Sequence, residues 1–135
     1  MPKRFAATVL SGVLLSISAA AFAADDPSIK GDLRADIKKA MLEHVGANTL
    51  DGDYIIYDAV EGNLLRLKFD ALHDGIVKKG DFYVACGDFN AHDGTYYDLD
   101  MLVAEKADGR MLVLQSVVHK REDEKREYHV ENVED

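Results

Sequence analysis

The chain is poor in cysteine, and this scarcity removes several structural options. Cys86 is the only cysteine, so no disulfide can form within the chain and no Cys-x-x-Cys metal or redox motif is present. In an oxidising compartment a lone thiol is either buried or joined to another molecule. Because Cys86 lies in a strand-like run of apolar residues, burial is favoured.

The short motifs that mark common enzyme sites are also missing. The sequence has no Gly-x-Ser-x-Gly, no His-Glu-x-x-His and no Asp/Gly series of the EF-hand type. Beyond the first 23 residues the only serines are Ser28 and Ser116, which offers serine catalysis little support. No motif points to a resident cofactor, and we expect none.

Basic residues are few relative to acidic ones. The chain has 16 Lys and Arg against 25 Asp and Glu, a formal net charge of −9 at pH 7. Such a charge repels phosphate backbones and anionic lipid surfaces, so it argues against nucleic-acid and membrane-surface partners. A cation or a basic protein is compatible with it.

The one long apolar run lies at the N-terminus. Lys3 and Arg4 precede a largely apolar stretch, 5–17, and Ala21-Phe22-Ala23 has the small-x-small form that signal peptidase reads. This pattern predicts a cleaved signal peptide over residues 1–23 and a periplasmic or secreted protein. No later run is long and apolar enough to span a bilayer, so we expect no membrane insertion after cleavage. Residues 24–135 have the length of a single domain.

The remainder is typical of one helix followed by strands. A helix is predicted from Asp26 to Val45, because apolar residues recur there every three or four positions. Asp26 is a fitting N-cap, and Pro27 follows at the first helical position. Residues 54–60 and 64–72 indicate a hairpin, and three runs between 81 and 120 alternate with a period of two. Asp-Gly turns join those runs. The pattern predicts the α+β class: one N-terminal amphipathic helix packed on a curved antiparallel meander of about five strands. The charged C-terminal tail either returns as a short edge strand or forms a helix.

This arrangement resembles the cystatin-like and NTF2-like α+β rolls of bacterial envelopes, on the basis of the Asp26-Pro27 helix start and the Asp-Gly turns. The resemblance implies a curved sheet that wraps a helix. The inhibitory Gln-Val-Val-Ala-Gly loop of cystatins is absent, so protease inhibition is not implied. Such rolls host enzymes, binders and adaptors, and the fold alone gives no function.

A register can be proposed for the strands between 81 and 120. If Asn90 pairs with Thr95, and Lys106 with Arg110, one face becomes apolar and a polar row of Asp88, Tyr97 and His119 lies at its end. The expected apolar face consists of Phe82, Val84, Cys86, Leu99, Met101, Val103, Met111, Val113 and Val117.

The polar row is the first candidate for a ligand-binding site. Asp88, Tyr97 and His119 would form a polar seat in an apolar cleft, with His44 from the helix and Cys86 nearby. The alternative is that these groups satisfy one another at the edge of the core. A zinc-type site of His119, Asp88 and His44 also stays open. In this register Cys86 and His119 lie roughly 11 to 12 Å apart, too far for a nucleophile and its base.

The opposite sheet face has a mixed character. Asp98 and Asp100 project from it roughly 7 Å apart. We expect them to be exposed to solvent and to keep this face hydrated rather than to act as an acid-base pair. An apolar set shares that face and forms a candidate surface for a partner protein or a homodimer. Its members are Tyr83, Phe89, Tyr96, Leu102 and Leu114.

Two classes of function follow. The first is an exported module that binds a small molecule or another envelope protein without chemistry of its own. The second is a small periplasmic enzyme or metal-binding protein that uses His119 with Asp88 and Tyr97. The absence of catalytic motifs favours the first.

Overall fold

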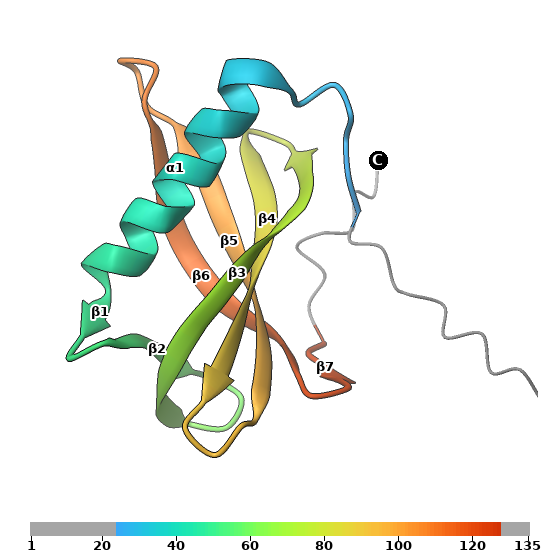
Figure 1. The fold of residues 1–135 in the computed structure, drawn as a ribbon. Helices are drawn as coiled ribbons and strands as arrows, with labels where there is room; N and C mark the ends of the chain where they lie inside the picture. The colour runs from blue at the N-terminus through green and yellow to red at the C-terminus, as the bar shows by residue number, and fades with distance from the viewer. Residues whose placement is uncertain (1–23, 128–135) are drawn as a thin grey trace, which may run out of the picture.

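The computed structural model describes residues 24–127, which form one helix and seven strands (Figure 1). The predicted signal peptide and the last residues of the tail, 128–135, lie outside this range. The elements are α1 (Gly31–Ala47), β1 (Thr49–Leu50), β2 (Asp53–Asp58), β3 (Asn63–Lys79), β4 (Phe82–Ala91), β5 (Tyr96–Glu105), β6 (Met111–Arg121) and β7 (Glu124–Lys125).

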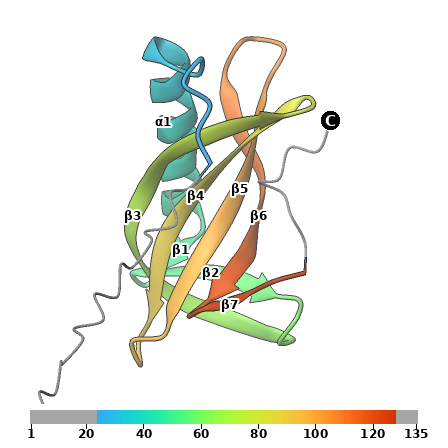
Figure 2. The same cartoon turned by 90° about the vertical axis from the view of Figure 1, so that its right-hand side faces the viewer.

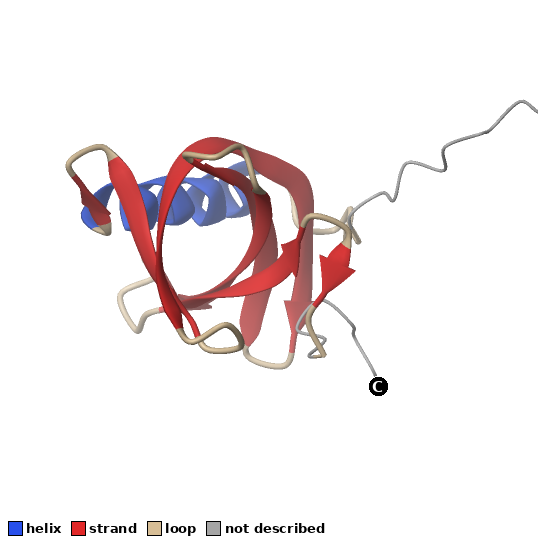
Figure 3. Ribbon diagram, turned by 90° about the horizontal axis from the view of Figure 1, so that it is seen from below, coloured by secondary structure: helices blue, strands red, loops and turns tan. Residues whose placement is uncertain are grey.

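The strands follow one another in a single antiparallel sheet of order β1 to β7 that does not close on itself. Figure 2 shows β3 to β6 running side by side, and Figure 3 shows the strands curling round an interior with α1 along one side. An antiparallel sheet with a helix is thus confirmed. The predicted α+β class is wrong, because 56% of the described residues are in strands and 16% in the helix. Within residues 24–127 no helix has the length and apolar character that a bilayer crossing requires.

The strands differ from the prediction in length and in number. In the segment 73–80, which the sequence leaves undecided between loop and strand, residues 73–79 continue β3 to a length of 17 residues. Irregular pairing with β4 after Phe69 and after Leu72 lets this strand bend rather than break. The two-residue strands β1 and β7 complete the seven, and β7 confirms the edge-strand alternative for the start of the tail.

The helix begins later than predicted. Asp26 caps a turn instead, because its Oδ1 accepts the Ser28 N–H at 2.9 Å and its carbonyl accepts the Ile29 N–H at 3.0 Å. The residue at the N-cap of α1 is Lys30, which makes no side-chain capping bond. The buried face of α1 contacts the core through Ile37, Ala40, Met41 and Val45.

The register of the β4–β5 hairpin differs from the prediction by one residue. The Ala91 N–H donates to the Thr95 carbonyl at 2.8 Å, so the loop has three residues and Asn90 faces Tyr96. Because strand side chains alternate, this shift turns β4 over. Tyr83, Ala85 and Phe89 therefore join the core beneath α1, and Val84 and Cys86 lie on the opposite face.

The β5–β6 hairpin starts in the predicted register and then leaves it. Val103 faces Val113, as expected, but irregularities follow between Leu102 and Val103 and between Asp98 and Leu99. As a result Val118, rather than Val117, faces Leu99 in the core. The face of β4, β5 and β6 that points away from α1 is called the second face below.

Candidate metal centre

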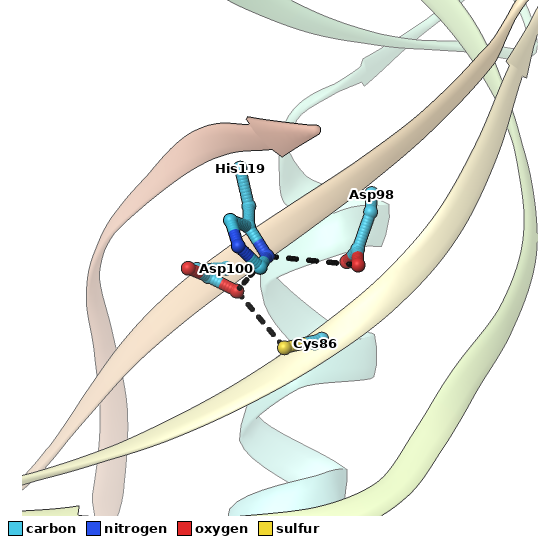
Figure 4. A group of neighbouring side chains, drawn as sticks. All are labelled: Cys86, Asp98, Asp100 and His119. Atoms are coloured by element: carbon cyan, nitrogen blue, oxygen red, sulfur yellow. Dashed lines mark hydrogen bonds and ion pairs between the residues drawn. The ribbon is translucent and has the colours of Figure 1, made fainter. Parts of the chain in front are cut away.

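Four side chains from three neighbouring strands converge on the second face (Figure 4). Cys86 on β4 faces Asp100 on β5, and Asp98 lies two residues before Asp100 on the same side of that strand. His119 on β6 falls in the irregularity between the Asp98–Lys120 and Leu99–Val118 pairs. A residue in such a bulge has no single partner opposite it, so His119 can reach both carboxylates.

The donor atoms are close enough to share one ion. One ligand atom from each of the four residues lies within 4.8 Å of the others. His119 Nδ1 is 3.6 Å from Asp98 Oδ2 and 3.5 Å from Asp100 Oδ1. Zinc–ligand bonds of 2.0 to 2.3 Å in a tetrahedron imply ligand separations of about 3.3 to 3.7 Å. The Cys86 Sγ donates to Asp100 Oδ1 at 2.9 Å, a contact that would lengthen when the thiol loses its proton.

The site is buried. The exposed fraction is 0% for Asp100, 7% for Asp98, 7% for His119 and 9% for Cys86. Buried carboxylates require compensation from hydrogen bonds or from positive charge. Asp98 Oδ1 has no hydrogen-bond partner among residues 24–127. Two buried carboxylates, one of them with an unsatisfied oxygen, form an electrostatic environment that favours a cation.

A second polar group adjoins this cluster. Asp88 is the cross-strand neighbour of Asp98. Its Oδ1 accepts a hydrogen bond from Tyr96 Oη at 2.6 Å and lies 2.6 Å from His73 Nε2. Burial raises the pKa of Tyr96, and the bond to Asp88 and the charge of Asp98 raise it further. The tyrosine therefore stays a neutral donor. Asp88 is thus engaged by two side chains outside the cluster and is not one of its four donors.

The predicted polar row is not formed. Asp88 and His119 lie on the second face, whereas Tyr97 lies in the core, where its hydroxyl accepts a bond from Arg121 Nε at 3.3 Å. The cause is the altered register of both hairpins, which pairs Asp88 with Asp98 and Tyr97 with Arg121. His44 is also elsewhere, bonded to Tyr54 and Ser116.

The distance argument that separated Cys86 from His119 is likewise wrong. It assumed regular pairing, in which Cys86 faces Leu99, but the shift of β4 places Cys86 opposite Asp100 and the bulge moves His119 towards it. The two donors consequently belong to one cluster. Of the five residues predicted for a ligand site, this cluster contains Cys86 and His119.

Two further expectations are corrected. Asp98 and Asp100 do not keep an exposed face wet, because both are buried. In the candidate partner surface, Tyr83 and Phe89 are core residues, exposed by 8% and 0%. Tyr96 and Leu102 are half-buried, and Leu114 is exposed. The pair of acidic residues in β5 was visible in the sequence, but its contact with Cys86 depends on the hairpin register.

Searches of known protein families, of curated proteins and of solved structures find no match to this chain. The resemblance to cystatin-like and NTF2-like rolls therefore stays a prediction.

Proposed function

We propose that this protein binds one divalent metal ion of borderline softness, with Zn²⁺ as the best fit, through Cys86, Asp98, Asp100 and His119. The observation that carries the proposal is the convergence of four donor groups within 4.8 Å at a buried position. Thiolate, imidazole and carboxylate together suit zinc, whereas calcium and magnesium favour oxygen donors alone.

The number of protein donors indicates the type of site. Structural zinc sites have four protein ligands, and catalytic sites keep a position for water. All four donors here come from neighbouring strands of the sheet, and no catalytic motif accompanies them. We therefore assign the ion a binding or structural role rather than a reaction.

The proposed setting is the periplasm or the exterior of the cell. The support is the N-terminal pattern of residues 1–23, with a basic start, an apolar stretch and Ala21-Phe22-Ala23. A metal ion bound to the Cys86 sulfur there would add to the protection from oxidation that burial already gives the thiol, and it would neutralise the carboxylates.

The test is metal binding by the exported protein. Native mass spectrometry after incubation with Zn²⁺ should show one ion per chain. Replacement of zinc by Co²⁺ should give a thiolate-to-metal charge-transfer band. We expect Cys86→Ser to abolish this band and His119→Gln and Asp98→Asn to abolish uptake at stoichiometric metal.

The matched control is His92→Gln. His92 is an exposed histidine that pairs with the carboxylate of Asp53 at 2.9 Å, so its loss should leave uptake unchanged. A circular dichroism spectrum establishes that each variant is folded. Equal uptake by His119→Gln and His92→Gln, or no uptake by the parent protein, would refute the proposal.

A further inference from the structure

A pocket of about 360 Å³ lies between β2 and β6, and none of the four proposed metal ligands lines it. Residues 56–60 line one side and residues 115–118 the other. Its volume falls within the range of roughly 300 to 1,000 Å³ that small-molecule sites occupy. The lining is mostly aliphatic and aromatic, and Ser116 supplies one of its few polar side chains.

Ser116 belongs to a triangle of hydrogen bonds with His44 and Tyr54. His44 Nε2 is 3.0 Å from Tyr54 Oη and 3.0 Å from Ser116 Oγ, and the two oxygens are 2.5 Å apart. On the other side of the ring, Asn48 Nδ2 lies 2.9 Å from the His44 carbonyl and 3.2 Å from His44 Nδ1. A carbonyl only accepts, so the amide atom that faces the ring is the NH₂ donor.

This contact determines where the ring carries its proton. Nδ1 accepts the Asn48 N–H, so the neutral imidazole has its hydrogen on Nε2. Burial lowers the pKa of His44, which keeps the ring neutral at pH 7. Nε2 is therefore a donor and cannot remove a proton from Ser116, which rules out a serine nucleophile activated by His44.

Counting hydrogens shows that one donor is left over. The triangle contains three hydrogens, one each from Nε2, Tyr54 and Ser116, and Nε2 accepts none. One hydroxyl hydrogen lies between the two oxygens, so the other must point outside the triangle. Among residues 24–127 neither hydroxyl makes a further hydrogen bond.

The free hydrogen is assigned to Ser116. Tyr54 is exposed by only 2%, whereas Ser116 lines the pocket. A phenol is also a stronger donor than an aliphatic hydroxyl, so Tyr54 donates to Ser116 across the 2.5 Å contact. The Ser116 O–H then remains to donate into the pocket.

We propose that this pocket binds an uncharged carbonyl compound, a ketone, ester or amide with an apolar body, whose oxygen accepts the Ser116 O–H. The apolar lining contacts the body of the ligand and the single donor fixes its orientation. A carboxylate fits poorly, because His44 is neutral, the Asp58 carboxylate is already paired with Arg126, and the chain carries a net charge of −9.

Three compounds of similar size test the proposal: acetophenone, ethylbenzene and benzoate. Titrations followed by amide proton and nitrogen chemical shifts should show acetophenone binding at residues 56–60 and 115–118. We expect ethylbenzene to bind roughly 2- to 12-fold more weakly, the value of one hydrogen bond, and benzoate more weakly still. Equal affinity for acetophenone and ethylbenzene, tighter binding of benzoate, or no shifts in the pocket would overturn it.

Two substitutions locate the donor. Ser116→Ala should remove the preference for acetophenone over ethylbenzene. Tyr54→Phe should keep it, because His44 then donates to Ser116 and the serine hydrogen still points into the pocket. A preference that survives Ser116→Ala, or one that Tyr54→Phe removes equally, would contradict the assignment. Because the three compounds are compared on the wild-type protein, their affinities test the proposal even if a variant fails to fold.

Discussion

Arg126, near the end of the described residues, contacts Asp58 at the end of β2. Its Nη2 lies 2.5 Å from Asp58 Oδ2, and the two side chains are exposed by only 4% and 2%. Its backbone N–H also donates to the carbonyl of His119 at 2.8 Å. Arg126 therefore links Asp58 at the end of β2 to the backbone of the proposed metal ligand His119. Replacing it with Met tests how much that contact contributes.

The expected loss can be estimated from the surroundings of Asp58. Removing one partner of a buried ion pair typically costs about 3 to 5 kcal/mol, because the other charge stays buried without compensation. Here Asp58 Oδ1 keeps the Val60 N–H at 3.0 Å and the Glu61 N–H at 3.4 Å, so the lower end applies. We predict that Arg126→Met lowers the free energy of unfolding by about 3 kcal/mol. For a domain of this size Tm should fall by roughly 12 °C or more.

Urea unfolding followed by circular dichroism measures the change. Arg110→Met is the matched control, because Arg110 pairs with Asp108 at 2.8 Å while both side chains are exposed, and we expect it to cost at most about 1 kcal/mol. The double variant Asp58→Leu with Arg126→Met should recover most of the lost stability, since it removes both buried charges. A loss for Arg126→Met no larger than for Arg110→Met would refute the reasoning, and so would a double variant less stable than the single one.

Three further predictions concern pH and packing. Burial places the folded pKa of His44 below 6.5, so the unfolded chain binds more protons and the free energy of unfolding should fall as pH drops below 6.5. Urea titrations at pH 7.5 and 5.5 should show a smaller difference in the free energy of unfolding for His44→Gln than for the parent protein. Hydrogen bonds from Lys68 and His92 lower the pKa of Asp53, so the stability that this carboxylate contributes is complete above about pH 3.9 and is lost as pH falls towards the folded pKa. In Asp53→Asn, the free energy of unfolding should therefore depend less on pH in the acid range. Met101→Ala should cost about 2 to 5 kcal/mol in thermal unfolding because Met101 is fully buried, whereas Leu114→Ala, at a side chain exposed by 61%, should cost less than about 0.5 kcal/mol; similar losses for both would contradict the observed register.

The sequence predicted the helix and the long strands in their observed order, but not the short strand β1. Helical spacing gave α1, and the turn at Gly62 formed as expected, with its N–H donating to the Asp58 carbonyl at 2.8 Å. The turn at Gly109 is equally regular, and the Lys106 N–H donates to the Arg110 carbonyl at 2.8 Å as predicted. These features depend on neighbouring residues, which is why local patterns reveal them.

The first hairpin shows where local patterns fail. Residues 90–95 accommodate a loop of three or of four residues, and each choice places apolar side chains on one face of β4, because Val84 and Cys86 alternate with Tyr83, Ala85 and Phe89. Both faces of this strand are largely buried, within the hydrophobic core on one side and within the polar cluster on the other. Alternation does not distinguish between two apolar faces, so the predicted register depended on the assumed length of the loop. Because the loop has three residues rather than four, the predicted register was wrong by one residue.

The proposed metal centre depends on irregularity, which explains why no motif spacing announced it. With regular pairing, Asp98 and Asp100 would each face a different residue of β6. The bulge places the single ring of His119 between the two levels, 3.6 Å from one carboxylate and 3.5 Å from the other. The sequence carries a weak trace of the bulge in the adjacent pair Val117-Val118, where the alternation of apolar and polar residues breaks, as it also does at 111–114. A bulge that turns Val118 into the core and aims His119 at two buried acids serves the core and the site at once, and a substitution that restored regular pairing there would have to give up one of them.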